Sequence, residues 1–177
     1  MRDNIINFVL FQIGWFACVL GGAGQQPLLG VLIASAIITY HLWRAQQPRY
    51  EINLMLIAML IGVIWDSLLV RFGLLDYSAG MLLPNTAPYW IVVLWALFAT
   101  TLNLSLRWLK GKIGLAVVLG AIAGPLAYYA GARLGAVEFV SINHAFLALA
   151  TGWAIFTPLL VAISNKMDGY SLQVART

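Results

Sequence analysis

The sequence predicts an all-α membrane protein with six transmembrane helices, on the strength of its composition, its apolar runs and the positions of its positive charges. Of the 177 residues, 62% are hydrophobic and only 9% are charged, whereas a soluble domain carries roughly 25% charged residues. Six helices of about 20 residues, each able to cross roughly 30 Å of hydrocarbon, account for nearly the whole chain. We therefore expect one polytopic membrane domain over residues 1–177 and no soluble catalytic domain.

Each predicted span is a continuous apolar run. Backbone groups cannot stay unpaired in lipid, and the runs lack the alternation of membrane-barrel strands, so each is expected to be a helix. The first run could also belong to a cleaved signal peptide, but Asp3, Gln12 and Trp15 interrupt that pattern. We expect an uncleaved first helix. The predicted spans cover residues 4–23, 27–43, 52–72, 88–108, 112–132 and 144–164.

The Lys and Arg residues predict the orientation of the spans. If the N-terminus is inside, only Arg71 and Arg133 fall outside. The positive-inside rule therefore places both termini in the cytoplasm. It also explains the net charge of +4 without a nucleic-acid partner, so the expected partner is the lipid bilayer of a bacterial inner membrane. The basic residues on the inner side are Arg2, Arg44, Arg49, Arg107, Lys110, Lys112, Lys166 and Arg176.

A constant shift of 58 residues overlays the third and fourth spans on the fifth and sixth. Gly62 then falls on Gly120, and Trp95 falls on Trp153. The overlay predicts a parallel hairpin repeat, an arrangement found in transporters and also in proteins that transport nothing. Small residues recur along one side of the third and fifth spans, so we expect these two helices to pack together through that side.

Asp66 is the acidic residue placed deepest in a predicted span. It lies about 14 residues into the third span, which is roughly 20 Å from the cytoplasmic end of that helix. A charge at this depth costs several kcal/mol and usually faces an interior cavity. Asp66 is therefore expected either to bind a cation, a proton or a polar headgroup, or to make a structural hydrogen bond or ion pair with Arg71, Arg133 or a tyrosine.

Further charged and aromatic residues gather on the predicted outer side. The pair Arg71 and Arg133 could hold a phosphate or carboxylate, and Asp66 or His144 could act as a general base. The same residues could instead be interfacial charges that pair across loops. Together with Asp66, the residues predicted to bind a ligand are Arg71, Asp76, Tyr128, Arg133 and His144.

Motifs that would identify a reaction are missing from the sequence. It has no phosphate-binding loop, no HExxH and no GxSxG pattern. His41 and His144 fall at opposite predicted membrane faces and cannot share a metal within one subunit, and Cys18 is the single cysteine. We expect no cofactor and no metal, we assign no catalytic residue, and we do not favour an enzyme.

Several stretches resemble one family of small bacterial inner-membrane proteins that is catalogued as a domain of unknown function. The opening stretch 7–16 resembles the start of that family, and stretches 65–67, 88–90 and 124–128 also fit it. The resemblance spans most of the chain. It implies a six-span membrane protein of about this length, but it implies no activity and assigns no catalytic residue.

Three functions remain open at this point. The favoured one is the binding or transport of a small molecule or lipid through a site near Asp66 and the outer arginine and tyrosine residues. The second is a non-catalytic membrane subunit or scaffold that forms homo- or hetero-oligomers. The third is a membrane-embedded enzyme that modifies lipids, with Asp66 and His144 as its acid–base groups.

Overall fold

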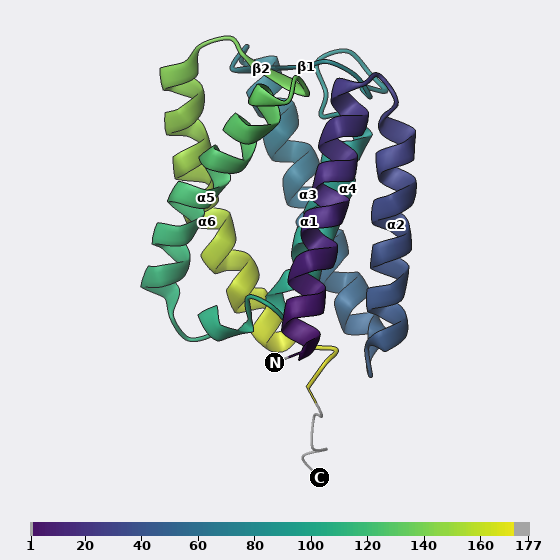
Figure 1. The fold of residues 1–177 in the computed structure, drawn as a ribbon. Helices are drawn as coiled ribbons and strands as arrows, with labels where there is room; N and C mark the ends of the chain where they lie inside the picture. Colours follow the sequence, from purple (N-terminus) through teal and green to yellow (C-terminus); the bar gives the residue numbers. More distant parts are fainter. Residues whose placement is uncertain (1, 172–177) are drawn as a thin grey trace.

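The computed structural model describes residues 2–171 and confirms the all-α class (Figure 1). In that part of the chain the long helices form one bundle, and all of them except α4 are long and apolar enough to cross a membrane. The helices are α1 (Arg2–Ala23), α2 (Pro27–Arg44), α3 (Pro48–Arg71), α4 (Tyr89–Leu102), α5 (Ile113–Arg133) and α6 (Ile142–Lys166). Two short strands, β1 (Leu75–Tyr77) and β2 (Val137–Phe139), and a 3₁₀ helix (Arg107–Leu109) lie between them.

Large apolar side chains cover the outside of the bundle. Leu60 and Leu147, for example, are 60% and 68% exposed, as expected for helices that face lipid. The chain enters α1 and leaves α6 at the same end of the bundle, which we call the inner end (Figure 1). The loops with most of the basic residues lie at this end, and Arg176 lies outside the described residues.

Proline and glycine set several helix ends. Pro27 and Pro48 stand in the first turns of α2 and α3, where the missing backbone N–H is not needed by the helix. Two residues beyond α3 and α5, Gly73 and Gly135 adopt φ angles of 64° and 87°. Glycine takes this left-handed conformation without a steric penalty, so at both places the chain turns directly from a helix into a strand.

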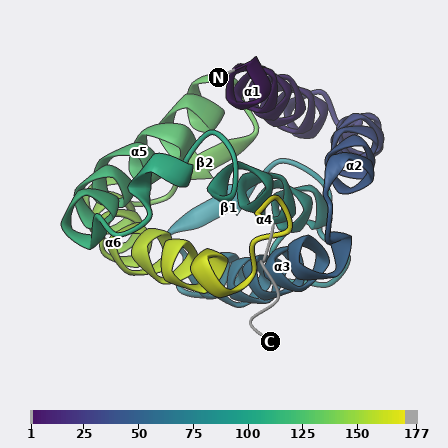
Figure 2. The same cartoon turned by 90° about the horizontal axis from the view of Figure 1, so that it is seen from below.

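The fourth helix is shorter than the predicted span 88–108. It ends at Leu102, and the chain continues as a turn and the 3₁₀ helix. Its 14 residues rise only about 21 Å, less than the roughly 30 Å of hydrocarbon. However, α4 packs against α1, α2, α3 and α6 and lies toward the middle of the bundle (Figure 2). Irregular backbone is tolerated at membrane depth where protein surrounds it, which explains how the helix can stop early.

The helices pack as the pairs α1–α2, α3–α4 and α5–α6. A Cβ added at Gly62 would lie 2.2 Å from Cδ1 of Trp95, and one added at Gly124 would lie 2.2 Å from Cγ of Trp153. The glycines of α3 and α5 therefore make room for an indole ring inside their own pair. The prediction that α3 and α5 pack together through their small residues is wrong for this reason.

A two-stranded antiparallel ribbon joins the outer ends of these two helix pairs. Asp76 of β1 stands opposite Glu138 of β2 at its centre. The Ser78 hydroxyl donates to the carbonyl oxygen of Ala136 at 2.8 Å. The apolar pattern of the sequence did not predict this ribbon, which fixes how α3 and α5 are placed at the outer end.

Gly62→Ala is expected to destabilise the fold by about 1–3 kcal/mol, because the new methyl group overlaps the Trp95 ring. Gly114→Ala in α5 is the matched control, since a Cβ there meets no atom within 4 Å. Thermal unfolding in detergent should show a lower midpoint for Gly62→Ala and an unchanged or higher one for Gly114→Ala. Equal midpoints for the two variants would contradict the close glycine–indole contact.

Candidate functional site

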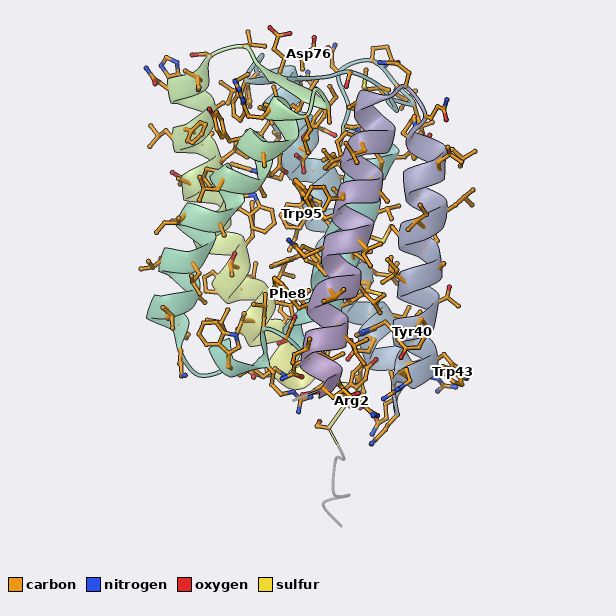
Figure 3. The ribbon with its side chains drawn as sticks, viewed as in Figure 1. Arg2, Phe8, Tyr40, Trp43, Asp76 and Trp95 are labelled. Atoms are coloured by element: carbon orange, nitrogen blue, oxygen red, sulfur yellow. The ribbon has the colours of Figure 1, made fainter. Side chains whose placement is uncertain are left out.

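A cavity of about 410 Å³ lies inside the bundle, between α1 and α5. Helices α1, α4, α5 and α6 form its sides, Tyr77 and Val137 of the ribbon lie at its outer end, and the segment Ser105–Leu109 lies at its inner end. Figure 3 shows Trp95 and Phe8 in the space between α1 and α5. The part of α4 that lines the cavity runs from Trp90 to Thr101, which makes the cavity roughly 16 Å long.

Large residues on one side of the cavity face small ones on the other. Helix α1 contributes Phe8, Phe11, Trp15 and Val19, whose spacing of three or four residues places them on one helix face. Helix α5 contributes mainly glycine and alanine, including Ala123 and Ala127. α1 and α5 do not form one of the main helix pairs. The cavity therefore exists because most of the α5 side chains that face it are too small to fill the space beside α1.

Asp66 lies beside the outer half of this cavity and is separated from it by residues that line the cavity. The side chain is fully buried. Its Oδ1 accepts hydrogen bonds from the hydroxyls of Tyr77 at 2.8 Å and Tyr128 at 2.6 Å, and its Oδ2 accepts one from Nε1 of Trp95 at 2.8 Å. We call these four residues the Asp66 site. All three partners are neutral donors, and within residues 2–171 no basic side chain forms an ion pair with Asp66.

The partners of Asp66 separate the carboxylate from the cavity. Tyr77, Trp95 and Tyr128 line the cavity while their polar atoms bond to Asp66. Trp95 stacks on Trp153 of α6, with ring centroids 4.6 Å apart and an interplanar angle of 12°. A molecule in the cavity would therefore contact aromatic rings directly, and would sense Asp66 through the groups that hydrogen-bond to it.

Of the ligand-binding residues predicted from the sequence, the structure brings together Asp66 and Tyr128. The other four are exposed at the outer end of the bundle: Arg71, Asp76, Arg133 and His144. Asp76 is visible there in Figure 3, and Nδ1 of His144 lies 2.8 Å from the Ser141 hydroxyl at the start of its own helix. The outer arginines are thus not part of the Asp66 site.

Tyr77 and Trp95 of the Asp66 site, and Trp153, which stacks on Trp95, were not predicted as binding residues from the sequence. Tyr77 belongs to a strand that the apolar pattern did not predict. Trp95 and Trp153 were recognised only as a matching pair in the repeat, because an aromatic residue in an apolar span is indistinguishable from ordinary core. The signal that could have found Trp95 is the glycine at position 62, whose lack of a side chain makes room for the indole.

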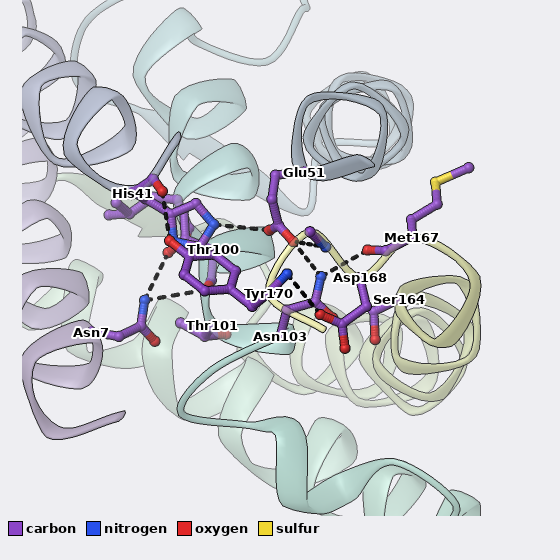
Figure 4. A network of polar contacts seen from close by, with 12 residues as sticks. Asn7, His41, Glu51, Thr100, Thr101, Asn103, Ser164, Met167, Asp168 and Tyr170 are labelled. Atoms are coloured by element: carbon purple, nitrogen blue, oxygen red, sulfur yellow. Dashed lines mark hydrogen bonds and ion pairs between the residues drawn. The ribbon is translucent and has the colours of Figure 1, made fainter. Parts of the chain in front are cut away.

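A second polar network lies at the inner end, and we call it the inner clasp (Figure 4). Glu51 is fully buried. It accepts hydrogen bonds from Asn103 Nδ2 at 2.7 Å and from the Gly169 amide at 2.8 Å, and its Oε2 lies 2.8 Å from His41 Nε2. These contacts tie α2, α3, the end of α4 and the segment after α6 together.

Ion pairs connect the inner clasp to the segment Ser105–Leu109 at the inner end of the cavity. Arg107 makes two hydrogen bonds to Asp168, at 2.7 and 2.9 Å, and Lys110 makes a third at 2.7 Å. Tyr170 donates its hydroxyl to the carbonyl oxygen of His41. Burial raises the pKa of the Tyr170 hydroxyl, so it keeps its proton and remains a donor. The clasp therefore fixes the 3₁₀ segment that closes the inner end of the cavity.

Comparison with protein families shows where this chain belongs. Residues 4–159 match the model of a family described as a protein of unknown function, DUF2878. The chain belongs to the DUF2878 family. This confirms the resemblance to a family of unknown function inferred from the sequence. Neither the curated proteins nor the solved structures include a match, so the function of this DUF2878 protein has to be inferred from its own geometry.

Proposed function

We propose that this protein binds a lipid-like molecule inside the membrane, in the cavity between α1, α4, α5 and α6. The observation that supports the proposal is an apolar cavity of about 410 Å³ at membrane depth. This volume falls within the range of roughly 300–1,000 Å³ that is typical of small-molecule sites. Its length of roughly 16 Å suits an acyl or isoprenoid chain better than a compact polar solute.

The boundaries of the cavity favour access from the bilayer. The ribbon residues Tyr77 and Val137 lie at one end and the segment Ser105–Leu109 lies at the other, whereas α1 and α5 stand apart along the side. An apolar molecule dissolved in the membrane can reach this side without crossing water. The geometry thus supports lipid binding more directly than the passage of a water-soluble solute from face to face.

The alternative functions draw less support from the structure. A lipid-modifying enzyme would need an acid–base pair at the cavity, yet His144 is exposed at the outer end and Asp66 has three hydrogen-bond partners of its own. A scaffold role is compatible with an Asp66 that is buried and hydrogen-bonded, but it does not explain why the protein has a cavity. The excess of basic residues on the inner side supports an orientation with both termini in the cytoplasm, and we propose a bacterial inner membrane as the location.

We also infer that the pairs α3–α4 and α5–α6 are two copies of one unit. Gly62 contacts Trp95 as Gly124 contacts Trp153, and Asp76 pairs with Glu138 at the centre of an antiparallel ribbon. A two-fold axis through the ribbon would relate these pairs. Under this inference Gly62 corresponds to Gly124 rather than to Gly120, so Asp66 corresponds to Tyr128.

Ala123→Phe and Ala127→Phe are expected to reduce the lipid bound in the cavity, because both alanines line it and a phenyl group would occupy the space. The measurement is mass spectrometry of lipids that stay with the purified protein after delipidation and re-equilibration with defined lipid mixtures. Both variants should keep the unfolding midpoint of the original chain, since the added ring fills existing volume.

Ala36→Phe on α2 is the control for this experiment. Ala36 is exposed to lipid and does not line the cavity, so the added ring changes only the lipid-facing surface. Ala36→Phe should retain the bound lipid. If all three variants retain it equally, the lipid belongs to the surrounding annulus and the proposed function is wrong.

A further inference from the structure

We propose that the cavity takes a lipid with an anionic phosphate headgroup from the leaflet at the inner end of the bundle. The apolar chain lies in the cavity, and the headgroup lies beside Lys112 at the inner end. This inference rests on the proposed function, and it adds the side of entry, the orientation and the headgroup class of the ligand.

The lining of the cavity is exposed in its inner half and buried at its outer end. Phe8, the lining residue of α1 nearest the inner end, is 54% exposed, whereas Val19 near the outer end is 3% exposed. On α5, Ala123 is exposed, Ala127 is half-buried and Gly131 is buried. Because both walls change in the same direction, a molecule in the bilayer reaches the cavity through the inner half of its side.

Contacts between the end of α1 and the ribbon close the outer end of this side. The Ser78 hydroxyl lies 3.0 Å from the carbonyl oxygen of Gly135 and 3.4 Å from that of Gly22. A Cβ added at Gly135 would lie 3.8 Å from Cβ of Ala23. Helices α1 and α5 converge toward this end and diverge toward the inner end (Figure 1). The leaflet at the inner end therefore has the wider access to the cavity.

An exposed basic side chain stands at the inner end of the opening. Trp108 lines the cavity and is 49% exposed, and Nζ of Lys112 lies 5.6 Å from the centroid of its ring. The neighbouring cations Arg107 and Lys110 both pair with Asp168. In the part of the chain that the structure describes, Lys112 forms no ion pair. Its ammonium group can therefore receive a phosphate.

The chemistry at this place selects a negatively charged headgroup. A cation is attracted to the face of an aromatic ring, so Trp108 keeps the Lys112 ammonium beside the cavity lining. A phosphate that reaches the ammonium gains a charge-assisted hydrogen bond, while its acyl chain gains the apolar contacts of the cavity. A zwitterionic headgroup brings its own cation to the same place and loses part of this attraction. The inner end thus favours an anionic lipid over a zwitterionic lipid with the same chains.

Two lipids with identical chains test the headgroup assignment. The delipidated protein in detergent micelles is equilibrated with equal mole fractions of dioleoyl phosphatidylglycerol and dioleoyl phosphatidylcholine, and bound lipid is counted by mass spectrometry. Cavity lipid is the part that Ala123→Phe loses, because the added ring occupies that space. In this part, phosphatidylglycerol should be enriched about fivefold, the preference that one basic residue gives near a membrane surface.

Four variants show which cation causes the enrichment. Lys112 is exposed, so Lys112→Gln removes its charge without disturbing the fold; the enrichment should vanish in this variant and return in Lys112→Arg. Lys166→Gln is the matched control, because Lys166 is also exposed at the inner end but faces away from the cavity residues Trp153 and Thr157 of its own helix. Arg133→Gln removes an exposed basic residue at the outer end of α5. Both controls should keep the enrichment.

Photoreactive lipids test the orientation. Phosphatidylglycerol with a diazirine on its headgroup should label residues 105–112, and the same lipid with a diazirine at the end of its acyl chain should label the outer half of the cavity, near Ala127 and Val137. The reverse pattern would place the headgroup at the outer end and contradict the inference. Glycerol 3-phosphate should displace neither probe. Displacement would mean that the site recognises a free phosphate and not a lipid.

The outcomes separate this inference from the proposed function. If Ala123→Phe loses both lipids in equal amounts, the cavity binds lipid but the headgroup assignment is overturned. The assignment is equally overturned if the enrichment persists in Lys112→Gln or disappears in Lys166→Gln. If Ala123→Phe loses neither lipid, the proposed function fails and the inference fails with it. An enrichment that depends on Lys112, and on neither Lys166 nor Arg133, supports the inference.

Discussion

Asp66→Ala is expected to lower the free energy of unfolding by about 3–5 kcal/mol. The substitution leaves the hydroxyls of Tyr77 and Tyr128 and the indole N–H of Trp95 without their acceptor in a fully buried place. Each donor would have to stay unpaired or draw in water. The measurement is the unfolding midpoint of the purified protein in detergent, followed by intrinsic tryptophan fluorescence.

Asp66→Asn provides the graded comparison. The amide oxygen can still accept from the two tyrosines, which both bond to Oδ1, but its amino group faces the Trp95 N–H that bonds to Oδ2. We expect a loss of about 1–3 kcal/mol, from one donor left without an acceptor. Tyr77→Phe and Tyr128→Phe should each cost about 1 kcal/mol. A midpoint for Asp66→Ala equal to that of the original chain would contradict the role of Asp66 as the shared acceptor.

The Asp66 variants also bear on function. Because Tyr77, Trp95 and Tyr128 line the cavity and are oriented by Asp66, losing the carboxylate should disturb the cavity wall as well as stability. A folded Asp66→Asn protein that binds lipid normally would confine Asp66 to a structural role. One that is folded but binds poorly would make Asp66 a positioning residue for the site.

Much of the fold was predictable because hydrocarbon constrains the chain so strongly. A long apolar run in lipid must be a helix, and the five longer helices lie close to their predicted ranges. α4 was predicted six residues too long at its C-terminal end because apolarity alone does not distinguish a helix from protein-covered turns. The polar residues Asn103, Ser105 and Arg107 mark this end: Asn103 bonds to Glu51 and Arg107 to Asp168.

The site was predictable only in part. Asp66 was recognisable because a carboxylate in the hydrocarbon requires partners, but the pattern did not single out Tyr77, Tyr128 and Trp95 as those partners. The candidate partners were Arg71, Arg133 and a tyrosine. Two tyrosines and a tryptophan bond to Asp66, and neither arginine does. Such donors leave no charge pattern in the sequence. The cavity was likewise invisible, since it arises from small α5 residues facing large α1 residues once the helices are placed.

Glu51→Ala is expected to have an effect of similar size at the opposite end of the bundle, about 3–5 kcal/mol of unfolding free energy. Glu51 is fully buried and receives hydrogen bonds from Asn103 and from the Gly169 amide, with His41 at its other oxygen. The sharpest readout is hydrogen exchange of the Gly169 amide, which should become much faster in the variant. Glu138→Ala, which removes an exposed carboxylate of β2, is the control and should leave that exchange unchanged.

Glu51→Gln separates the geometry of the inner clasp from its charge. The amide oxygen can replace Oε1 as acceptor for Asn103 and Gly169, and its amino group can donate to His41 Nε2 if the imidazole carries its proton on Nδ1. This variant should therefore protect the Gly169 amide nearly as well as the original chain. Because the inner clasp holds the segment that closes the inner end of the cavity, Glu51→Ala should also weaken lipid binding, whereas Glu51→Gln should not. Equal binding by both variants would mean that the cavity floor is held by Arg107, Lys110 and Asp168 without help from Glu51.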